Sequence, residues 1–133
     1  MSDNDTTEQH PHFPSGEWKG FYLQQMTDQA DQHPMAMILN FKNGKVDGSG
    51  SDEVGAFRWY GEYDVAQSTC RMIKQYDGRH AVAYDGRADD NGIYGTWYLS
   101  PSWKGGFHIW PKGITEKAEE EEVVTATMAI GAT

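Results

Sequence analysis

Apolar side chains recur at every second position in several short segments of the chain. Met35, Met37, Leu39 and Phe41 share one side of a segment, and Phe57 and Trp59 repeat the pattern further along. Successive side chains of a β-strand point to opposite faces of a sheet, so a period of two indicates half-buried strands. No segment between these runs has the length and the period of an amphipathic helix.

Turn residues separate the alternating runs at intervals of about 10 to 14 residues, close to the spacing typical of all-β sandwiches and barrels. Asn43-Gly44 and Asp77-Gly78 predict two tight hairpins, because Asn, Asp and Gly accept the backbone angles of two-residue turns. A loop is expected over 85–92. The predicted strands cover residues 17–26, 35–41, 45–50, 55–63, 68–76, 79–84, 93–99 and 107–110.

Short connections between about eight strands indicate an antiparallel up-and-down meander. A meander remains an open sheet or closes on itself, and closure removes two unpaired edges that invite aggregation. We therefore predict an all-β fold, with the strands closed into a small barrel.

The 133 residues suffice for one domain. Residues 1–15 are polar, lack periodicity and predict a disordered tail. The barrel is expected over 16–113. Residues 114–133 form an acidic C-terminal tail whose role the sequence leaves open among fraying, a short helix and docking on a neighbour.

Charge narrows the choice of partners. The chain has 11 Lys and Arg against 20 Asp and Glu, a formal net charge of −9, which argues against nucleic acid and anionic membranes. The longest apolar run, 35–39, is too short to span a bilayer. With no signal peptide and a single cysteine, Cys70, a cytoplasmic location is expected. The alternative is a mature secreted chain, for which Asn4-Asp5-Thr6 matches a glycosylation acceptor pattern.

The segment Ser15-Gly16-Glu17-Trp18-Lys19-Gly20-Phe21-Tyr22 places a Gly-x-Trp motif at the start of the meander. This combination resembles the calycins, which include lipocalins, fatty-acid-binding proteins and avidins, without matching one subfamily. The resemblance implies that Trp18 closes one end of the barrel. It also implies that a basic residue near the last strand, here Lys112, packs across Trp18.

An eight-stranded barrel either fills its interior with side chains or holds one small ligand. The predicted inward face is apolar with a few polar tips, as in a ligand pocket. We therefore expect a protein that binds a small apolar or aromatic ligand. The predicted ligand-binding residues are Tyr22, Gln24, Met37, Leu39, Trp59, His80, Tyr84 and Trp97.

Two other functions remain open. A filled barrel would act as an interaction or oligomerisation module, such as a homodimer, through outward aromatic residues. These residues are Tyr60, Tyr94, Tyr98, His108 and Trp110. Alternatively, a haem protein or an enzyme would use the cavity, with His108 as the haem ligand if the last strand had the opposite phase.

Known chemical motifs do not fit the chain. Residues 85–92 resemble a calcium loop, but alignment of Gly92 with the required glycine places Arg87 and Tyr98 at the terminal ligand positions. His80 has no partner at metal-ligand spacing, and Cys70 has no recognisable base. We predict no metal ligand, no catalytic residue and no cofactor, with haem as the alternative.

Overall fold

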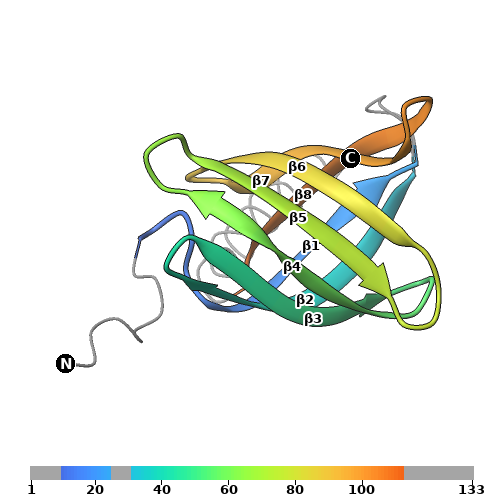
Figure 1. Cartoon of the computed structure of the whole chain (residues 1–133), viewed down its shortest axis with the longest axis horizontal. Helices are drawn as coiled ribbons and strands as arrows, with labels where there is room; N and C mark the ends of the chain where they lie inside the picture. The colour runs from blue at the N-terminus through green and yellow to red at the C-terminus, as the bar shows by residue number, and fades with distance from the viewer. Residues whose placement is uncertain (1–9, 25–30, 113–133) are drawn as a thin grey trace, which may run out of the picture.

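The computed structural model describes residues 10–24 and 31–112, which form one closed antiparallel barrel (Figure 1). Each strand pairs with its neighbours in the chain, and β1 also pairs with β8 to close the sheet. The predicted all-β barrel is confirmed. The described residues contain no helix that is long and apolar enough to span a membrane. The strands are β1 (Gly16–Leu23), β2 (Gln32–Lys42), β3 (Lys45–Asp52), β4 (Ala56–Asp64), β5 (Thr69–Tyr76), β6 (Ala81–Asp89), β7 (Gly92–Ser100) and β8 (Trp103–Pro111).

The first predicted hairpin has the expected backbone, with positive φ at both Asn43 (53°) and Gly44 (81°). The second differs from the prediction, because only Gly78 has positive φ (67°). The amide of Tyr76 donates to the carbonyl of His80 at 3.1 Å, so the loop contains three residues rather than two. A glycine in the left-handed region is typical of such three-residue hairpins.

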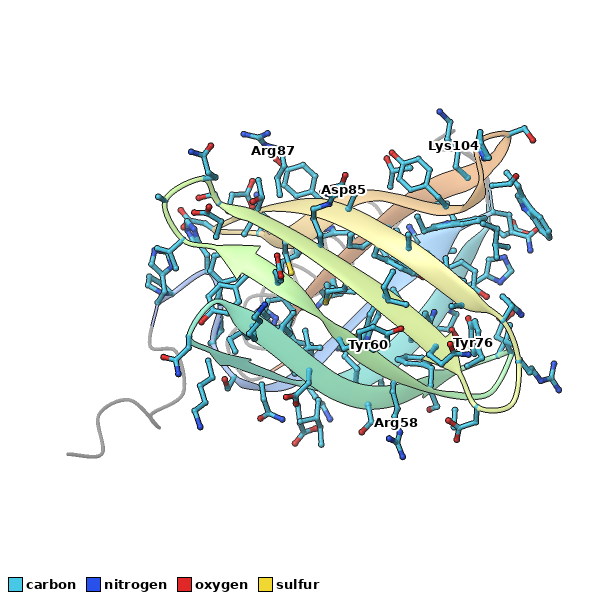
Figure 2. All side chains as sticks on the ribbon, in the orientation of Figure 1. Arg58, Tyr60, Tyr76, Asp85, Arg87 and Lys104 are labelled. Carbon is cyan, nitrogen blue, oxygen red and sulfur yellow. The ribbon has the colours of Figure 1, made fainter. Side chains whose placement is uncertain are left out.

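The predicted loop over 85–92 is wrong, because β6 continues to Asp89. Gly86 and Ala88 are buried, while Asp85 and Arg87, which alternate with them, are exposed, so the alternation of β6 continues almost to its end. Figure 2 shows Asp85 and Arg87 on the outside of the barrel. Their charges suggested a solvated loop, although they occupy the outer face of a strand.

Trp18 is buried at one end of the barrel. Its side chain is buried against Phe41, with ring centroids 5.7 Å apart, and its indole N–H donates to the carbonyl of Pro14 at 2.8 Å. Phe13 is fully buried at the same end, 4.9 Å from the ring of Tyr63. We call this the closed end.

The burial of Phe13 corrects part of the predicted N-terminal tail. Residues 10–15 pack on the barrel, and the hydroxyl of Ser15 accepts a hydrogen bond from the amide of Phe41 at 2.8 Å. One aromatic side chain among polar residues has no period, which explains why the sequence pattern missed it. The rest of the predicted tail, residues 1–9, and the predicted C-terminal tail lie outside the described residues.

The expected contact of Lys112 with Trp18 is wrong. The ammonium of Lys112 lies 3.5 Å from the carboxylate of Glu17, and the two side chains are 45% and 67% exposed. Glu17 neighbours Trp18 on β1 but points to the opposite face of the sheet. Lys112 therefore pairs with a carboxylate outside the barrel.

Candidate functional site

A charged pair lies inside the barrel, near the end opposite Trp18. Lys74 on β5 and Asp52 at the end of β3 have side chains with no solvent exposure, and their Nζ and Oδ2 atoms lie 2.5 Å apart. Both residues follow the inward alternation of their strands, after Cys70 and Met72 on β5 and after Val46 on β3. The alternation of the strands therefore places two opposite charges in the interior.

The Asp52 carboxylate is fully hydrogen-bonded. Its Oδ2 atom also accepts from the hydroxyl of Tyr76 at 2.6 Å. Its Oδ1 atom accepts from the amide of Val54 at 2.8 Å, within the narrow turn that joins β3 to β4. Charge-assisted bonds of this kind hold a buried carboxylate in one orientation. The turn and the neighbouring strand thus fix the position of Asp52.

The ammonium of Lys74 also has a partner for each of its hydrogen-bond donors. Besides Asp52, its ammonium donates to the hydroxyl of Tyr84 at 3.2 Å and lies 3.5 Å from the sulfur of Met35, so all three N–H groups have partners. Aromatic rings surround the same nitrogen, and the faces of such rings attract a cation. The centroid distances are 4.5 Å to Phe57, 4.8 Å to Tyr22, 5.0 Å to Tyr76, 5.3 Å to Tyr84 and 5.7 Å to Trp59.

Burial changes the acid–base behaviour of these groups. Loss of hydration lowers the pKa of Lys74 to about 8, although the hydrogen bond and the charge of Asp52 oppose the shift. Burial first, and then the negative charges of Asp52 and Glu53, raises the pKa of Tyr22 to about 12. Burial also raises the pKa of Tyr76 and of Tyr84 well above the usual value. All three tyrosines are therefore neutral hydroxyls at physiological pH.

A cavity of about 200 Å³ opens directly above this cluster, at what we call the open end. Tyr22, Tyr76 and Tyr84 belong both to the shell around Lys74 and to the cavity wall, so they separate the charged pair from the cavity. The remaining wall is mostly apolar, with polar groups at the rim. It consists of Gln24, Val54, His80, Val82, Trp97, Leu99 and Trp103.

Trp97 is held in place by the backbone on one side of the cavity. Its indole N–H donates to the carbonyl of Leu23 at 2.7 Å, and its ring meets Tyr22 edge-on. Gly105 makes this orientation accessible, since a Cβ atom there would lie 2.7 Å from the indole nitrogen and 2.2 Å from the Leu23 carbonyl oxygen. Gly105 therefore leaves space for a rigid aromatic wall.

Five of the eight predicted ligand-binding residues line the cavity. Tyr22, Tyr84 and Trp97 form its walls, while Gln24 and His80 lie exposed at its rim. His80 was expected to point inward from a strand but lies in the hairpin before β6, with its ring 5.0 Å from that of Tyr76. The other three, Met37, Leu39 and Trp59, are buried in the hydrophobic core and are not part of the cavity wall.

The sequence interpretation missed Asp52, Lys74 and Tyr76. Asp52 falls between the predicted strands 45–50 and 55–63, and none of the predicted ligand-binding residues lies on the predicted strand 68–76. The signal was present, because Lys74 and Tyr76 continue the alternation that begins at Cys70. Because buried lysine is rare, the charge of Lys74 indicates solvent exposure even where the alternation of the strand points to the interior.

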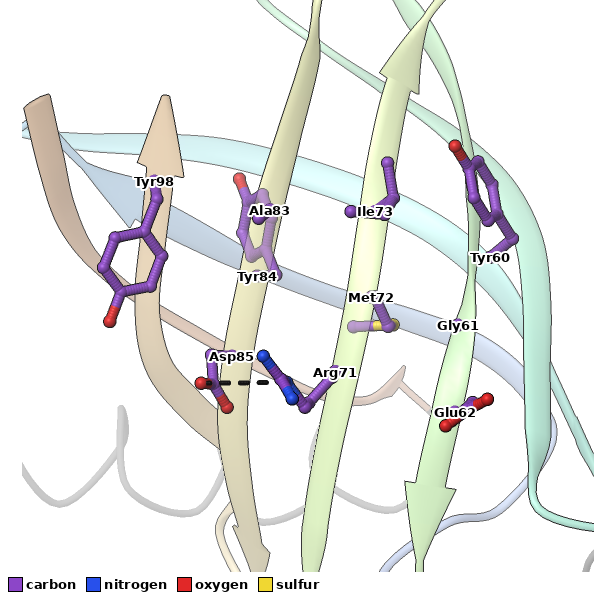
Figure 3. A pocket seen from close by; sticks show the side chains of 10 residues that line it. All are labelled: Tyr60, Gly61, Glu62, Arg71, Met72, Ile73, Ala83, Tyr84, Asp85 and Tyr98. Carbon is purple, nitrogen blue, oxygen red and sulfur yellow. Dashed lines mark ion pairs between the residues drawn. The ribbon is translucent and has the colours of Figure 1, made fainter. Parts of the chain in front are cut away.

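A second, shallower hollow lies on the outer surface, across β4 to β7 (Figure 3). Tyr60 and Tyr98 stand on its two sides, and Arg71 and Asp85 form an ion pair of 3.9 Å between them. Arg71 and Asp85 are both more than half exposed. This outer groove is open to solvent and contains no enclosed charged group.

The histidine considered for haem lies outside the barrel. His108 Nε2 is 2.6 Å from the carbonyl oxygen of Asn91, and its ring packs against Trp110 and Phe21. Phe107 and Ile109 on either side of it are buried, so β8 has the phase first predicted. Within residues 10–24 and 31–112, no three His, Cys, Asp or Glu side chains are grouped as metal ligands would be.

No protein-family model matches this chain, and neither a curated protein nor a solved structure is significantly similar to it.

Proposed function

We propose that this protein binds a small, predominantly apolar ligand containing one ring in the cavity at the open end of the barrel. The observation that carries the proposal is the enclosure of the cavity by Tyr22, Tyr84, Trp97 and Leu99 above an immobilised charged pair. Ligand sites combine apolar walls with a few fixed polar groups in this way.

The size of the cavity supports a ligand of one ring. A cavity of about 150 Å³ in another protein holds benzene, and the cavity here measures about 200 Å³. Longer ligands would protrude past the rim formed by Gln24, His80 and Trp103. The core below, which contains Trp59 and Phe57, leaves the ligand no deeper place to enter.

Membership of the calycins is part of the same proposal. It is supported by the closed eight-stranded barrel and by Trp18, which is buried at the closed end beneath residues 13–14. Small barrels of this type often carry their ligands in an open end. Lys112 does not contribute to this support.

Toluene and a pair of adjacent substitutions test the ligand proposal. Val82 lines the cavity, whereas Ala83, its neighbour on β6, lines the outer groove. We expect ligand-detected NMR and tryptophan fluorescence to show toluene binding to the wild type and to Ala83→Phe, but not to Val82→Phe. If Val82→Phe binds toluene as well as the wild type does, the ligand does not occupy this cavity.

A second candidate function is assembly through the outer face. Tyr60, Tyr94 and Tyr98 are 51%, 41% and 37% exposed, which is a large aromatic area for one face of a monomer. Sedimentation of the wild type and of Tyr60→Lys tests this candidate. A dimer that Tyr60→Lys dissociates would support it, and a monomer at high concentration would exclude it.

A further inference from the structure

The hydrogen bonds at the floor of the cavity restrict which polar group a ligand can carry. Every acceptor position of Asp52 that faces the cluster is used, by Lys74, Tyr76 and the amide of Val54. A ligand that donates a hydrogen bond therefore meets no free carboxylate oxygen. The negative charge of Asp52 is also balanced by Lys74 at 2.5 Å.

Two of the donors around the floor are committed within the protein, and that of Tyr84 is free. Tyr76 gives its single proton to Asp52. Trp97 donates to the carbonyl of Leu23. The oxygen of Tyr84 accepts from Lys74, but its own proton has no acceptor among the described residues.

Tyr84 is placed to offer that proton to a ligand. Its side chain is buried and forms part of the cavity wall. Figure 3 shows its hydroxyl directed along the barrel toward the level of Ile73 and Ala83, which is the side of the open end. Because the oxygen receives the Lys74 hydrogen bond, the proton must turn away from Lys74.

The indole N–H of Trp59 is a second hydrogen-bond donor without a partner among the described residues. Trp59 is buried beside Tyr84, with ring centroids 4.7 Å apart, and its indole N–H has no hydrogen-bond partner. Trp59 does not line the cavity, so it adds to the polarity of the floor without contacting the ligand. The spare group of Tyr84 and that of Trp59 are both hydrogen-bond donors.

From this arrangement we infer that the ligand is an uncharged aromatic molecule whose single polar group is a hydrogen-bond acceptor, such as a ketone or aldehyde oxygen, bound by the hydroxyl of Tyr84. This inference rests on the proposed function and specifies its ligand class. A carboxylate would add a second negative charge beside Asp52, and Lys74 has no N–H group left to bind it. An ammonium or amidinium would find no free carboxylate at the floor, because Asp52 is already paired with Lys74.

Four ligands of nearly the same shape test the inference in the wild-type protein. They are acetophenone, α-methylstyrene, which replaces the carbonyl oxygen by a methylene group, benzoate and benzamidinium. We expect acetophenone to bind about 3- to 10-fold more tightly than α-methylstyrene, as one neutral hydrogen bond provides. Both charged ligands should bind more weakly than acetophenone. Stronger binding of benzoate or benzamidinium would overturn the inference.

The infrared carbonyl stretch of bound acetophenone provides a readout of the hydrogen bond itself. It should fall below its value in an alkane, return toward that value in Tyr84→Phe, and remain lowered in Tyr60→Phe, an exposed tyrosine outside the barrel. An unshifted carbonyl in the wild type overturns the inference even if Tyr84→Phe fails to fold.

The results also separate this inference from the proposed function. If acetophenone and α-methylstyrene bind equally, and Val82→Phe abolishes both, the cavity binds ligands but has no preference for acceptors. If neither ligand binds, the proposed function fails and the ligand class fails with it.

Discussion

Removal of one charge from the buried pair should destabilise the barrel more than removal of both. Lys74 and Asp52 have no exposed side-chain surface, and their charged atoms are 2.5 Å apart. At an effective dielectric constant of about 20, their mutual attraction is about 7 kcal/mol. Dehydration of two ions costs several kcal/mol each, so the pair contributes little net stability.

The single variants lose the attraction and keep one dehydrated charge. We expect Lys74→Met and Asp52→Asn each to lower the free energy of unfolding by about 3 to 5 kcal/mol. The double variant contains neither charge and retains an oxygen that can accept from the amide of Val54. Its stability should lie within about 2 kcal/mol of the wild type.

Urea denaturation at pH 7, followed by tryptophan fluorescence and circular dichroism, measures these losses. Lys45→Met is a matched control, because Lys45 pairs with Glu62 at 2.8 Å while both side chains are about 70% exposed. That control should lose less than about 1 kcal/mol. The reasoning is refuted if Lys74→Met loses no more than Lys45→Met, or if the losses of the single variants add in the double variant.

Further predictions concern four single side chains. Burial lowers the native pKa of Lys74 from 10.5 to about 8, so the unfolded chain binds more protons between these values. The free energy of unfolding of the wild type, measured in urea, should therefore rise by about 3 kcal/mol relative to that of the Lys74→Met/Asp52→Asn variant as pH rises from about 8 to 10.5. A decrease over this range would contradict the prediction. Burial raises the pKa of Cys70 to about 12. An aromatic disulfide reagent at pH 8 should therefore label the thiol only as fast as the protein unfolds. Labelling at the rate of a free thiol would contradict this prediction. Trp18→Ala should cost about 3 to 5 kcal/mol in denaturation experiments. Lys112→Ala should cost less than about 1 kcal/mol, because its ion pair is exposed, and equal losses would place Lys112 against Trp18 after all.

The barrel could be predicted because its strands follow a period of two and its turns carry distinctive residues. Met35, Met37 and Leu39 establish the inward face of β2, and Asn43-Gly44 fixes the hairpin that follows. Strand ends were harder to predict. Asp85 and Arg87 look like loop residues, although a strand with one solvent-facing side accepts charges there.

The chemistry of the open end was predictable in part. Tyr22, Tyr84 and Trp97 follow the inward alternation of apolar strands, so they were found from the pattern. Lys74 and Asp52 follow the same alternation, but their charges indicate solvent exposure when each is considered alone. Because β3 and β5 both pair with β4, their inward side chains meet, and each charge compensates the other.

The alternation of apolar and polar residues does not predict contacts between distant segments of the chain. Phe13 packs on Tyr63, which lies fifty positions further along the chain, and no local period indicates such a contact. His80 has the inward parity of β6, but a third loop residue in the hairpin moves it to the rim.

The most direct test of the ligand site is an intermolecular nuclear Overhauser measurement on methyl-labelled protein with bound acetophenone. Val54, Val82 and Leu99 line the cavity, whereas Ile73 and Ala83 line the outer groove. We predict cross-peaks from the ligand ring to the methyl groups of Val54, Val82 and Leu99. Cross-peaks confined to Ile73 and Ala83, or no cross-peaks at saturating ligand, would contradict the account.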